Sequence, residues 1–376
     1  MAAEVVHGLE GVPIAESGIS FVDGKAGRLE YRGISIEDLA EHSTFEETAY
    51  LLLFGKLPTR EEADPFQVEL RTHRRLKYRI LDLIKCLPET GHPMDALQAG
   101  IAAIGMFYPL RQKMDDVDRG LACIRLISKT PSVVAAFERL RKGDQQVSPR
   151  DDLTLAGNFL YMMTGKDPDP LKQRILDLCL ILHADHTMNA STFAGRVVGS
   201  TLATPYSVTS SALGALSGPL HGGANEDVMA LLDSIGSPQR AGAVIEEMIA
   251  NKTKVPGFGH RVYKTMDPRA KILKKYAQQL SQTSGTHHFE TALVVEKVVQ
   301  EHYQEKGIWP NVDFFSGIVY TELNIPRDCF TPVFAIARMA GWLAHWLEQV
   351  ERNRIFRPTQ KYVGPHDQPY VPIEKR

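Results

Sequence analysis

The chain has 376 residues, of which 43% are hydrophobic and 23% charged, and its formal net charge is −2. This length allows two or three domains of about 100–200 residues each, and the composition is ordinary for a globular protein with a large core. The near-neutral charge argues against a global attraction to nucleic acid or to an anionic membrane. We therefore expect a globular, cytoplasmic protein with neither nucleic acid nor a membrane as partner.

The cysteines are far apart in the sequence and include no CxxC pair: Cys86, Cys123, Cys179 and Cys329. In a chain of this length we expect buried, reduced thiols rather than a disulfide framework. Residues 1–10 contain no apolar run, so no secretory signal is expected. The longest apolar stretches are shorter than the ~20 residues that a membrane helix needs.

The N-terminal region is the part of the sequence with a β pattern. Residues 19–23 alternate apolar and polar side chains, residues 24–27 contain two glycines, and residues 28–32 alternate again. This pattern predicts a β-hairpin. From Ser35 onward the period is helical, and Asp38 stands three residues after Ser35 as in a capping box.

Apolar residues recur at helical spacing along most of the remaining chain. The predicted helices are 44–53, 76–87, 96–108, 118–128, 132–141, 153–164, 169–184, 207–216, 226–235, 241–250, 268–279, 289–302 and 331–350. Glycine and proline mark many of the joins. Because strands do not alternate with helices, a doubly wound sheet is not expected, and no internal repeat suggests a solenoid. The sequence predicts a mainly all-α fold with a short N-terminal β-hairpin.

Residues 222–315 lie between two polar, glycine-containing motifs, HGGAN at 221–225 and NVDFFSG at 311–317. We predict that this segment is a small helical domain, hinged on a large helical domain made of residues 1–221 and 316–376. Clefts between domains are favoured places for ligands.

Three histidine-containing motifs stand out: LHADHTMN at 182–189, GPLHGGAN at 218–225 and VPGFGHRVY at 255–263. Glycines beside His221 and His260 let the backbone approach a ligand, and loops often carry function. For His221, a helix-capping loop with a purely structural histidine is an equally good interpretation. Around His260 the glycines and nearby Lys264 suit phosphate, although the GxxxxGK[ST] pattern of a P-loop is absent.

A metal site is the alternative interpretation of the first histidine motif. His183 and His186 are three residues apart and would share a face if they lay on one helix. Zinc needs three or four protein ligands, and neither HExxH nor paired cysteines accompany them. We expect no metal, and one of these two histidines is more simply a core residue.

Arginines and one carboxylate complete the candidates. Arg338 lies in the apolar segment 333–342, where a charge costs free energy unless it is paired. Arg357 is a weaker candidate because the neighbouring arginines look solvated. Guanidinium groups bind carboxylates through two hydrogen bonds, so a cluster of them predicts a di- or tricarboxylate ligand. Either arginine alone would be interpreted as a structural ion pair. Asp313, in NVDFFSG, is the candidate carboxylate.

Taken together, these motifs resemble the citrate synthase family. GPLHGGAN, PGFGHRVYKTMDPRA, NVDFFSG and the terminal RPTQKYVG stand in the family's order, and ISFVDGKAGRLEYRG at 19–33 is similar to the shorter bacterial and archaeal type. The resemblance covers essentially the whole chain. It implies a mainly helical fold with a large and a small domain, a homodimer or higher oligomer, and acetyl-CoA and oxaloacetate as substrates.

The resemblance also implies roles for individual residues. The catalytic set would be His221, His260 and Asp313. The residues implied for oxaloacetate are His186, Arg269, Arg338 and Arg357, with Arg357 supplied by the neighbouring subunit. The residues implied for CoA are Lys254, Val255, Pro256, Gly257, Gly259, Lys264 and Asn311. No metal and no other cofactor is implied, since the CoA thioester is a substrate.

The implied chemistry is a condensation followed by hydrolysis of citryl-CoA. Asp313 would remove a methyl proton from acetyl-CoA, neutral His221 would donate a hydrogen bond to the enolate oxygen, and His260 would polarise the ketone of oxaloacetate. One alternative is 2-methylcitrate synthase acting on propionyl-CoA, since one methylene gives only about 1–3 kcal/mol of discrimination. Another is a non-catalytic helical scaffold or sensor on the same fold.

Overall fold

The computed structural model describes residues 5–108 and 114–376. Residues 1–4, part of the N-terminal stretch considered for a secretory signal, lie outside the described residues. The N-terminal strands are β1 (Ser20–Asp23), β2 (Arg28–Tyr31) and β3 (Ile34–Ser35), in antiparallel order β1-β2-β3. The predicted hairpin is confirmed. β3 was not predicted, because two residues are too short for an alternating pattern.

Within residues 5–108 and 114–216, ten helices follow the sheet. They are α1 (Ile36–His42), α2 (Phe45–Phe54), α3 (Arg60–Thr72), α4 (Tyr78–Lys85), α5 (Pro93–Gly105), α6 (Asp116–Arg141), α7 (Leu155–Thr164), α8 (Pro170–His183), α9 (Ala190–Ser200) and α10 (Pro205–Leu216). Ser35 caps α1 by accepting a hydrogen bond from the Asp38 N–H, as expected. Side-chain caps of this kind explain why many predicted boundaries are accurate.

Six helices complete the fold. They are α11 (Ala224–Ile235), α12 (Pro238–Ala250), α13 (Pro268–Ser284), α14 (His288–Tyr303), α15 (Val312–Glu322) and α16 (Phe330–Glu351). The described residues also include the 3₁₀ turns η1 (His7–Leu9), η2 (Gln304–Lys306), η3 (Arg327–Cys329) and η4 (Ile373–Lys375). The mainly all-α prediction is confirmed. The predicted domain boundary at residue 315 falls inside α15, and the division itself stays a prediction.

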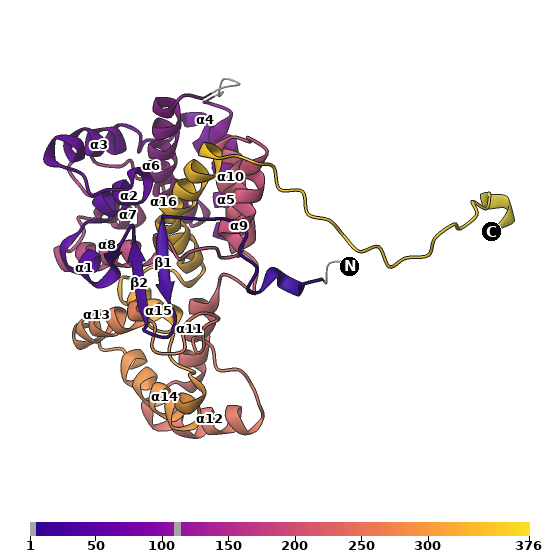
Figure 1. Cartoon of the computed structure of the whole chain (residues 1–376). Helices are drawn as coiled ribbons and strands as arrows, with labels where there is room; N and C mark the ends of the chain where they lie inside the picture. Colours follow the sequence, from indigo (N-terminus) through magenta and orange to yellow (C-terminus); the bar gives the residue numbers. More distant parts are fainter. Residues whose placement is uncertain (1–4, 109–113) are drawn as a thin grey trace.

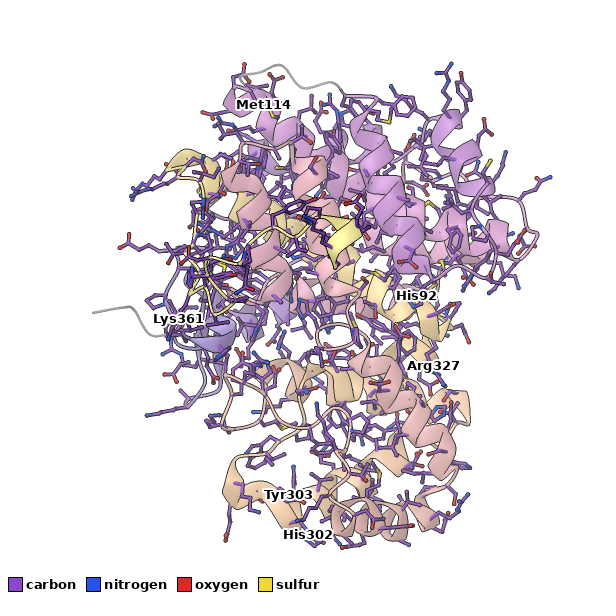
Figure 2. All side chains as sticks on the ribbon, turned by 90° about the vertical axis from the view of Figure 1, so that its right-hand side faces the viewer. His92, Met114, His302, Tyr303, Arg327 and Lys361 are labelled. Atoms are coloured by element: carbon purple, nitrogen blue, oxygen red, sulfur yellow. The ribbon has the colours of Figure 1, made fainter. Side chains whose placement is uncertain are left out.

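The helices lie in two regions with the junction near α15. Figure 1 shows α12 and α14 at the end of the molecule opposite α3 and α4, with α11, α13 and α15 between them. Figure 2 places His92 and Arg327 near this junction, and His302 and Tyr303 at the far end beside α12 and α14. α16 crosses the core, where it contacts α2, α6, α8, α9 and α10. Its side chains are almost all buried from Phe330 to Trp346.

α6 differs most from the sequence prediction. Helices were expected at 118–128 and 132–141, but one helix runs through residues 129–131, which include Pro131. The two-helix prediction was wrong because burial of side chains on all sides of α6 outweighs the local cost of proline. By length and composition α6 could also cross a membrane, but 83% of its apolar window is buried in the protein, as in an ordinary core helix.

Three helices were not predicted: α3, α9 and α15. α9 has the sequence ASTFAGRVVGS, in which small and polar residues hide the helical period. α15 contains the NVDFFSG motif, which was interpreted as a loop. Almost the whole surface of α15 is buried, so its apolar residues do not gather on one face as in an amphipathic helix.

All four cysteines are free thiols. Cys123, Cys179 and Cys329 are buried, as expected, but Cys86 is exposed. The prediction for Cys86 was wrong because it follows α4 on the side away from the buried Ile80 and Ile84.

The C-terminal segment beyond α16 leaves the body of the protein. Figure 1 shows it as a long extended chain that ends far from the helices. It exposes large apolar side chains, including Val363 at 86% and Tyr370 at 82%. Exposed apolar side chains gathered on one segment are typical of a surface that another molecule covers.

Candidate active site

The first candidate, His221, is held in one tautomer. It lies in the turn between α10 and α11, and its Nε2 accepts a hydrogen bond from the backbone N–H of Ser191 at 3.2 Å. The Ser191 hydroxyl is also 2.8 Å from this nitrogen. Because Nε2 accepts, the proton of the neutral ring belongs on Nδ1. Burial, and then the nearby charge of Arg338, lower the pKa of His221 to about 4, so the ring is neutral at pH 7.

Ser191 belongs to the first turn of α9, and two side chains fix it. Its hydroxyl accepts from Nε1 of Trp342 at 3.1 Å, and because the backbone N–H requires a lone pair on Nε2 of His221, the hydroxyl shares its one proton between that nitrogen and Oδ1 of Asn189, which lies 2.7 Å away. The same Asn189 oxygen caps α9 by accepting from the Thr192 N–H at 3.0 Å. The loop before α9 therefore determines the orientation of His221. Sequence reasoning missed Ser191, although an Asn at the start of a helix is a recognisable N-cap signal.

His260 is held in the opposite tautomer. Its Nδ1 accepts hydrogen bonds from the backbone N–H groups of Val262 at 3.0 Å and Tyr263 at 3.2 Å. The proton of the neutral ring therefore lies on Nε2. Burial first, and then the positive charge of Arg269, lower the pKa of His260 to about 4. His260 is thus a second neutral N–H donor.

His186 lies beside His260, with ring centroids 5.2 Å apart. Its Nε2 is 3.1 Å from the hydroxyl of Tyr263, and burial, followed by the charge of Arg269, holds its pKa well below the usual value. The alternative in which His183 and His186 share a helix face is not met, because α8 ends at His183 and His186 lies in the following loop. Sequence reasoning missed Tyr263, because one tyrosine in a loop carries no distinguishing pattern.

His183 is a core residue and does not face a common metal site with His186. Its side chain is fully buried, and Nδ1 lies 2.7 Å from the carbonyl oxygen of Cys179. Within the described residues, a grouping with metal-ligand spacing occurs elsewhere, at Glu138, Asp328 and Cys329. Arg141 already binds Asp328 through two hydrogen bonds of 2.6 and 2.8 Å and also pairs with Glu138. A bound cation would have to displace this arginine.

Asp313 is the carboxylate of the site. It lies in the first turn of α15, where Oδ1 of Asn311 caps the helix by accepting from the Asp313 N–H at 3.0 Å. In the part of the chain that the structure describes, no hydrogen-bond donor contacts its carboxylate. Burial raises the pKa of Asp313 to about 6, against the opposing effect of Arg269. A carboxylate without a donor and with a raised pKa is suited to accept a proton.

Two buried arginines bring these groups into one electrostatic environment. The charge of Arg269 acts on His260 and Asp313, and the charge of Arg338 acts on His221 and Asp313. Arg269 binds Asp267 through two hydrogen bonds of 3.0 and 2.8 Å. The structure thus gathers the predicted catalytic set around two guanidinium groups.

Arg338 was predicted to meet either an internal carboxylate or an anionic ligand. Its Nε donates to the carbonyl oxygen of His183 at 2.8 Å, and its guanidinium lies 4.6 Å from the ring centre of Phe334. Across the described ranges, no carboxylate forms an ion pair with it. Burial lowers the pKa of Arg338 to about 10, so it is still charged at pH 7. This environment favours the anionic ligand.

The residues predicted for CoA form a loop joined to Asp313. Asn311 donates its N–H to the carbonyl oxygen of Gly257 at 2.9 Å and its Nδ2 to that of Gly259 at 3.0 Å. A Cβ at Gly257, which has φ +78°, would lie 2.7 Å from Val228 and 2.8 Å from Phe314. Only glycine fits there.

The other predicted CoA residues differ in exposure. Lys254 and Lys264 are exposed, Val255 is buried and Pro256 is partly buried. The two lysines are therefore free to meet phosphate groups from solvent. Val255 supports the loop from inside.

Arg357 is the predicted site residue that the structure does not bring to the others. It is exposed in the C-terminal segment, where its Nη1 donates to the carbonyl oxygen of Pro358 at 3.0 Å. Figure 1 shows this segment leaving the body of the same chain. The expected contribution to a neighbouring subunit stays a prediction.

Several known proteins resemble this chain over almost its whole length. The family model "Citrate synthase, C-terminal domain" matches residues 8–359. A citrate synthase of Synechocystis is 56% identical over 98% of this chain and 94% of its own length. The structure of the Pyrobaculum aerophilum citrate synthase is 43% identical and superposes with a TM-score of 0.93 over 99% of this chain and 95% of that one.

A third relative carries ligands. The citrate synthase of Thermoplasma acidophilum, solved as a ternary complex with carboxymethyl coenzyme A and oxaloacetate, is 35% identical with a TM-score of 0.94. This match covers 99% of this chain and 100% of that chain. The chain therefore belongs to the citrate synthase family.

Proposed function

We propose that this protein condenses acetyl-CoA with oxaloacetate and hydrolyses the resulting citryl-CoA to citrate and CoA. The observation that carries the proposal is the pair of neutral histidines with opposite, fixed tautomers, together with Asp313, whose carboxylate has no donor among the described residues and which shares the charges of Arg269 and Arg338 with them. A cytoplasmic location fits this reaction and the relatives that match the chain.

The first step is removal of a methyl proton from acetyl-CoA. Asp313 accepts this proton, and electron density moves to the thioester oxygen as the enolate forms. His221 donates its Nδ1–H to that oxygen. A neutral donor is suited to this role because it stabilises the developing charge without giving up its proton. The fixed loop and Ser191 set the direction of the donor before the substrate arrives.

The second step forms the carbon–carbon bond. The enolate carbon attacks the ketone of oxaloacetate, while His260 polarises the ketone oxygen through its Nε2–H and gives it a proton as the alkoxide forms. Water then attacks the thioester of citryl-CoA, which releases citrate and the CoA thiol. The proton that Asp313 took from acetyl-CoA then returns to His260, so that the ring is not left as an imidazolate and the protons balance before the hydrolysis.

Oxaloacetate binding falls to positively charged and neutral donors. We assign its carboxylates and their surroundings to Arg269, Arg338 and His186, with Arg357 entering from a second subunit. Guanidinium groups bind carboxylates with two parallel hydrogen bonds. Support comes from the buried charge of Arg338, which forms no ion pair with a carboxylate among the described residues, and from the ring of His186 beside His260.

CoA binding falls to the loop between α12 and α13. The backbone of Val255, Pro256, Gly257 and Gly259 would line the ligand, while Lys254 and Lys264 would meet its phosphates. Asn311 joins this loop to Asp313, so CoA binding and base position are mechanically linked. We further propose that residues 222–315 close on the rest of the chain when oxaloacetate binds, which would exclude water before condensation.

A homodimer completes this proposal. The C-terminal segment exposes apolar side chains and carries Arg357 away from its own body, as expected for a segment that packs on another copy. Assembly above the dimer is compatible with the same surfaces.

The test is release of free CoA thiol from acetyl-CoA, with and without oxaloacetate, beside a matched propionyl-CoA series. We expect release that depends on oxaloacetate and is faster with acetyl-CoA. Faster release with propionyl-CoA would assign 2-methylcitrate synthase activity to the same residues. No release with either substrate would contradict the proposed catalysis and favour the scaffold interpretation.

A further inference from the structure

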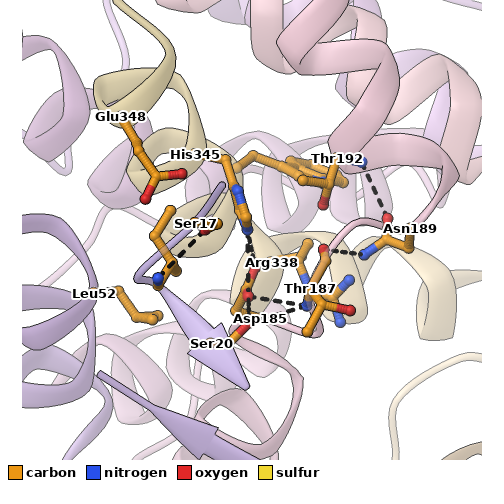
Figure 3. A network of polar contacts seen from close by, with 12 residues as sticks. Ser17, Ser20, Leu52, Asp185, Thr187, Asn189, Thr192, Arg338, His345 and Glu348 are labelled. Carbon is orange, nitrogen blue, oxygen red and sulfur yellow. Dashed lines mark hydrogen bonds and ion pairs between the residues drawn. The ribbon is translucent and has the colours of Figure 1, made fainter. Parts of the chain in front are cut away.

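Asp185 is a fully buried carboxylate outside the proposed catalytic set. It accepts hydrogen bonds from the hydroxyl of Ser20 and from the N–H of Thr187, the latter at 3.1 Å. Nε2 of His345 lies 3.3 Å from its Oδ1. Figure 3 shows Asp185 at the centre of these contacts, between β1 and α16. Burying a carboxylate costs free energy of folding unless hydrogen-bond donors or positive charges stabilise it.

The contacts around His345 assign its tautomer. Its Nδ1 lies 3.3 Å from Nη1 of Arg196, and arginine can only donate. The ring proton therefore lies on Nε2 and points toward Asp185. Arg196 is held in turn by Glu348 at 2.8 Å. Burial is the largest influence and acts to raise the pKa of Asp185, but the combined effects of His345, Arg338 and the Ser20 hydroxyl keep that pKa below its usual value.

Asp185 fixes a strained loop between α8 and α9. Thr187 has φ +54°, a left-handed conformation that β-branched residues rarely adopt. Its N–H is shared between Asp185 Oδ2 and Ser20 Oγ, both at 3.1 Å. On the other side, the N–H of Gly341 donates to the carbonyl oxygen of Ala184 at 3.1 Å. A Cβ at Gly341 would lie 2.5 Å from the Asp185 carboxylate, so α16 approaches as closely as glycine permits.

The loop that Asp185 fixes carries two parts of the site. His186 follows it directly in the chain and lies 5.2 Å from His260 between ring centres. Asn189, two residues after Thr187, holds Ser191, which donates to Nε2 of His221. The same short segment therefore carries His186 and, through Asn189 and Ser191, the contact that sets the tautomer of His221.

We propose that Asp185 is a positioning residue that sets both His186 and, through Asn189 and Ser191, His221. This rests on the proposed function, because the roles of the two histidines come from it. A single buried carboxylate thereby couples the site for oxaloacetate to the site for the thioester oxygen.

The test begins with Asp185→Asn, which keeps the shape but removes the charge and one acceptor. We expect kcat to fall by about tenfold or more and KM for oxaloacetate to rise by about tenfold. The matched control is Asp177→Asn. Asp177 is also buried on α8, accepts from the Phe45 N–H at 3.1 Å and pairs with Arg174 at 2.9 Å. Because it contacts none of the histidines, its variant should lower the melting temperature and leave kcat and KM within about twofold.

A second pair of variants decides the question if Asp185→Asn does not fold. His345→Gln retains a donor for Asp185 and an acceptor for Arg196, whereas His345→Met retains neither. We expect the glutamine variant to recover most of the kcat that the methionine variant loses. Equal kcat in both folded variants would overturn the proposed link.

Imidazole ¹⁵N NMR of the full-length protein gives a readout that does not depend on turnover. We expect an Nδ1-protonated His221 and an Nε2-protonated His260 in the wild type. Asp185→Asn should disturb the signals of His186 and His221 while the tautomer of His260 is unchanged. Unchanged His186 and His221 signals would overturn the inference. If the wild type showed no activity but Asp185→Asn still changed the His186 and His221 signals, only the proposed function would be contradicted.

Discussion

The backbone N–H of Ser191 donates to Nε2 of His221 at 3.2 Å, and this one contact determines which nitrogen of His221 faces a substrate as a donor. The donor is a main-chain group in the first turn of α9, so substitution of the Ser191 side chain does not remove it. Helix N-termini present such N–H groups in fixed directions. The protein thus orients His221, the proposed enolate donor, with backbone geometry as well as with the Ser191 side chain.

This relationship predicts unequal effects at the two positions. Ser191→Ala keeps the N–H and loses the hydroxyl contacts, so we expect kcat to fall by about tenfold or less. His221→Ala removes the enolate donor, for which a loss of about 10²–10³ in kcat is expected. Both are measured by CoA thiol release at saturating substrates. A Ser191→Ala loss as large as that of His221→Ala would place the essential contact on the hydroxyl.

Asp313→Asn is expected to lower kcat by about 10³ or more, because the amide cannot accept the methyl proton. Oxaloacetate binding should persist, since Arg269 and Arg338 are untouched. Turnover and calorimetric titration with oxaloacetate measure the two effects separately. Near-normal turnover would remove Asp313 from the mechanism.

The activity should depend on pH through Asp313. Its pKa is raised to about 6, and the base works only as the carboxylate. We expect kcat/KM for acetyl-CoA to fall about tenfold per pH unit below pH 6 and to level above it. His221 and His260, each with a pKa near 4, stay neutral across that range. A profile that is flat down to pH 5 would contradict the assignment.

The raised pKa of Asp313 also predicts that stability falls as the pH rises, whereas activity increases. Its value of about 6 in the folded protein exceeds the ordinary value of 3.8, so folding favours the protonated form. The stabilising contribution of Asp313 is fully present below about pH 4 and is lost as the pH rises through 6. Asp313→Asn should therefore raise the melting temperature at pH 7.5, and by less at pH 5. Calorimetry at both values checks this.

A shared active site predicts complementation between two inactive chains. Asp313→Asn lacks the base, and Arg357→Ala lacks the residue proposed to enter the neighbouring site. In a mixed dimer, the Arg357→Ala chain keeps its own Asp313 and receives Arg357 from its partner. We expect activity to reappear after the two proteins are mixed and their subunits exchanged. If Arg357 acted within its own chain, the mixture would stay inactive.

The sequence could predict those parts of the fold that depend on local pattern. Caps and apolar periods placed α2, α7 and α10 within a few residues of their observed bounds. α15 escaped because a helix buried on all sides has no polar face, and α6 was divided because proline is a local signal that packing overrides. The resemblance supplied the catalytic residues. Ser191, Tyr263 and Asp185 could not be predicted, since their contacts join segments far apart in the chain.

Four contacts described above come from one face of α16. Arg338, Gly341, Trp342 and His345 bind His183, Ala184, Ser191 and Asp185, respectively, and their spacing of three, four and seven residues is that of a single helical stripe. Each residue of an α-helix turns the chain by about 100°. A single inserted or deleted residue early in α16 would rotate the whole stripe away from the loop. The length of this helix should therefore resist change during evolution more strongly than the identity of most side chains on it.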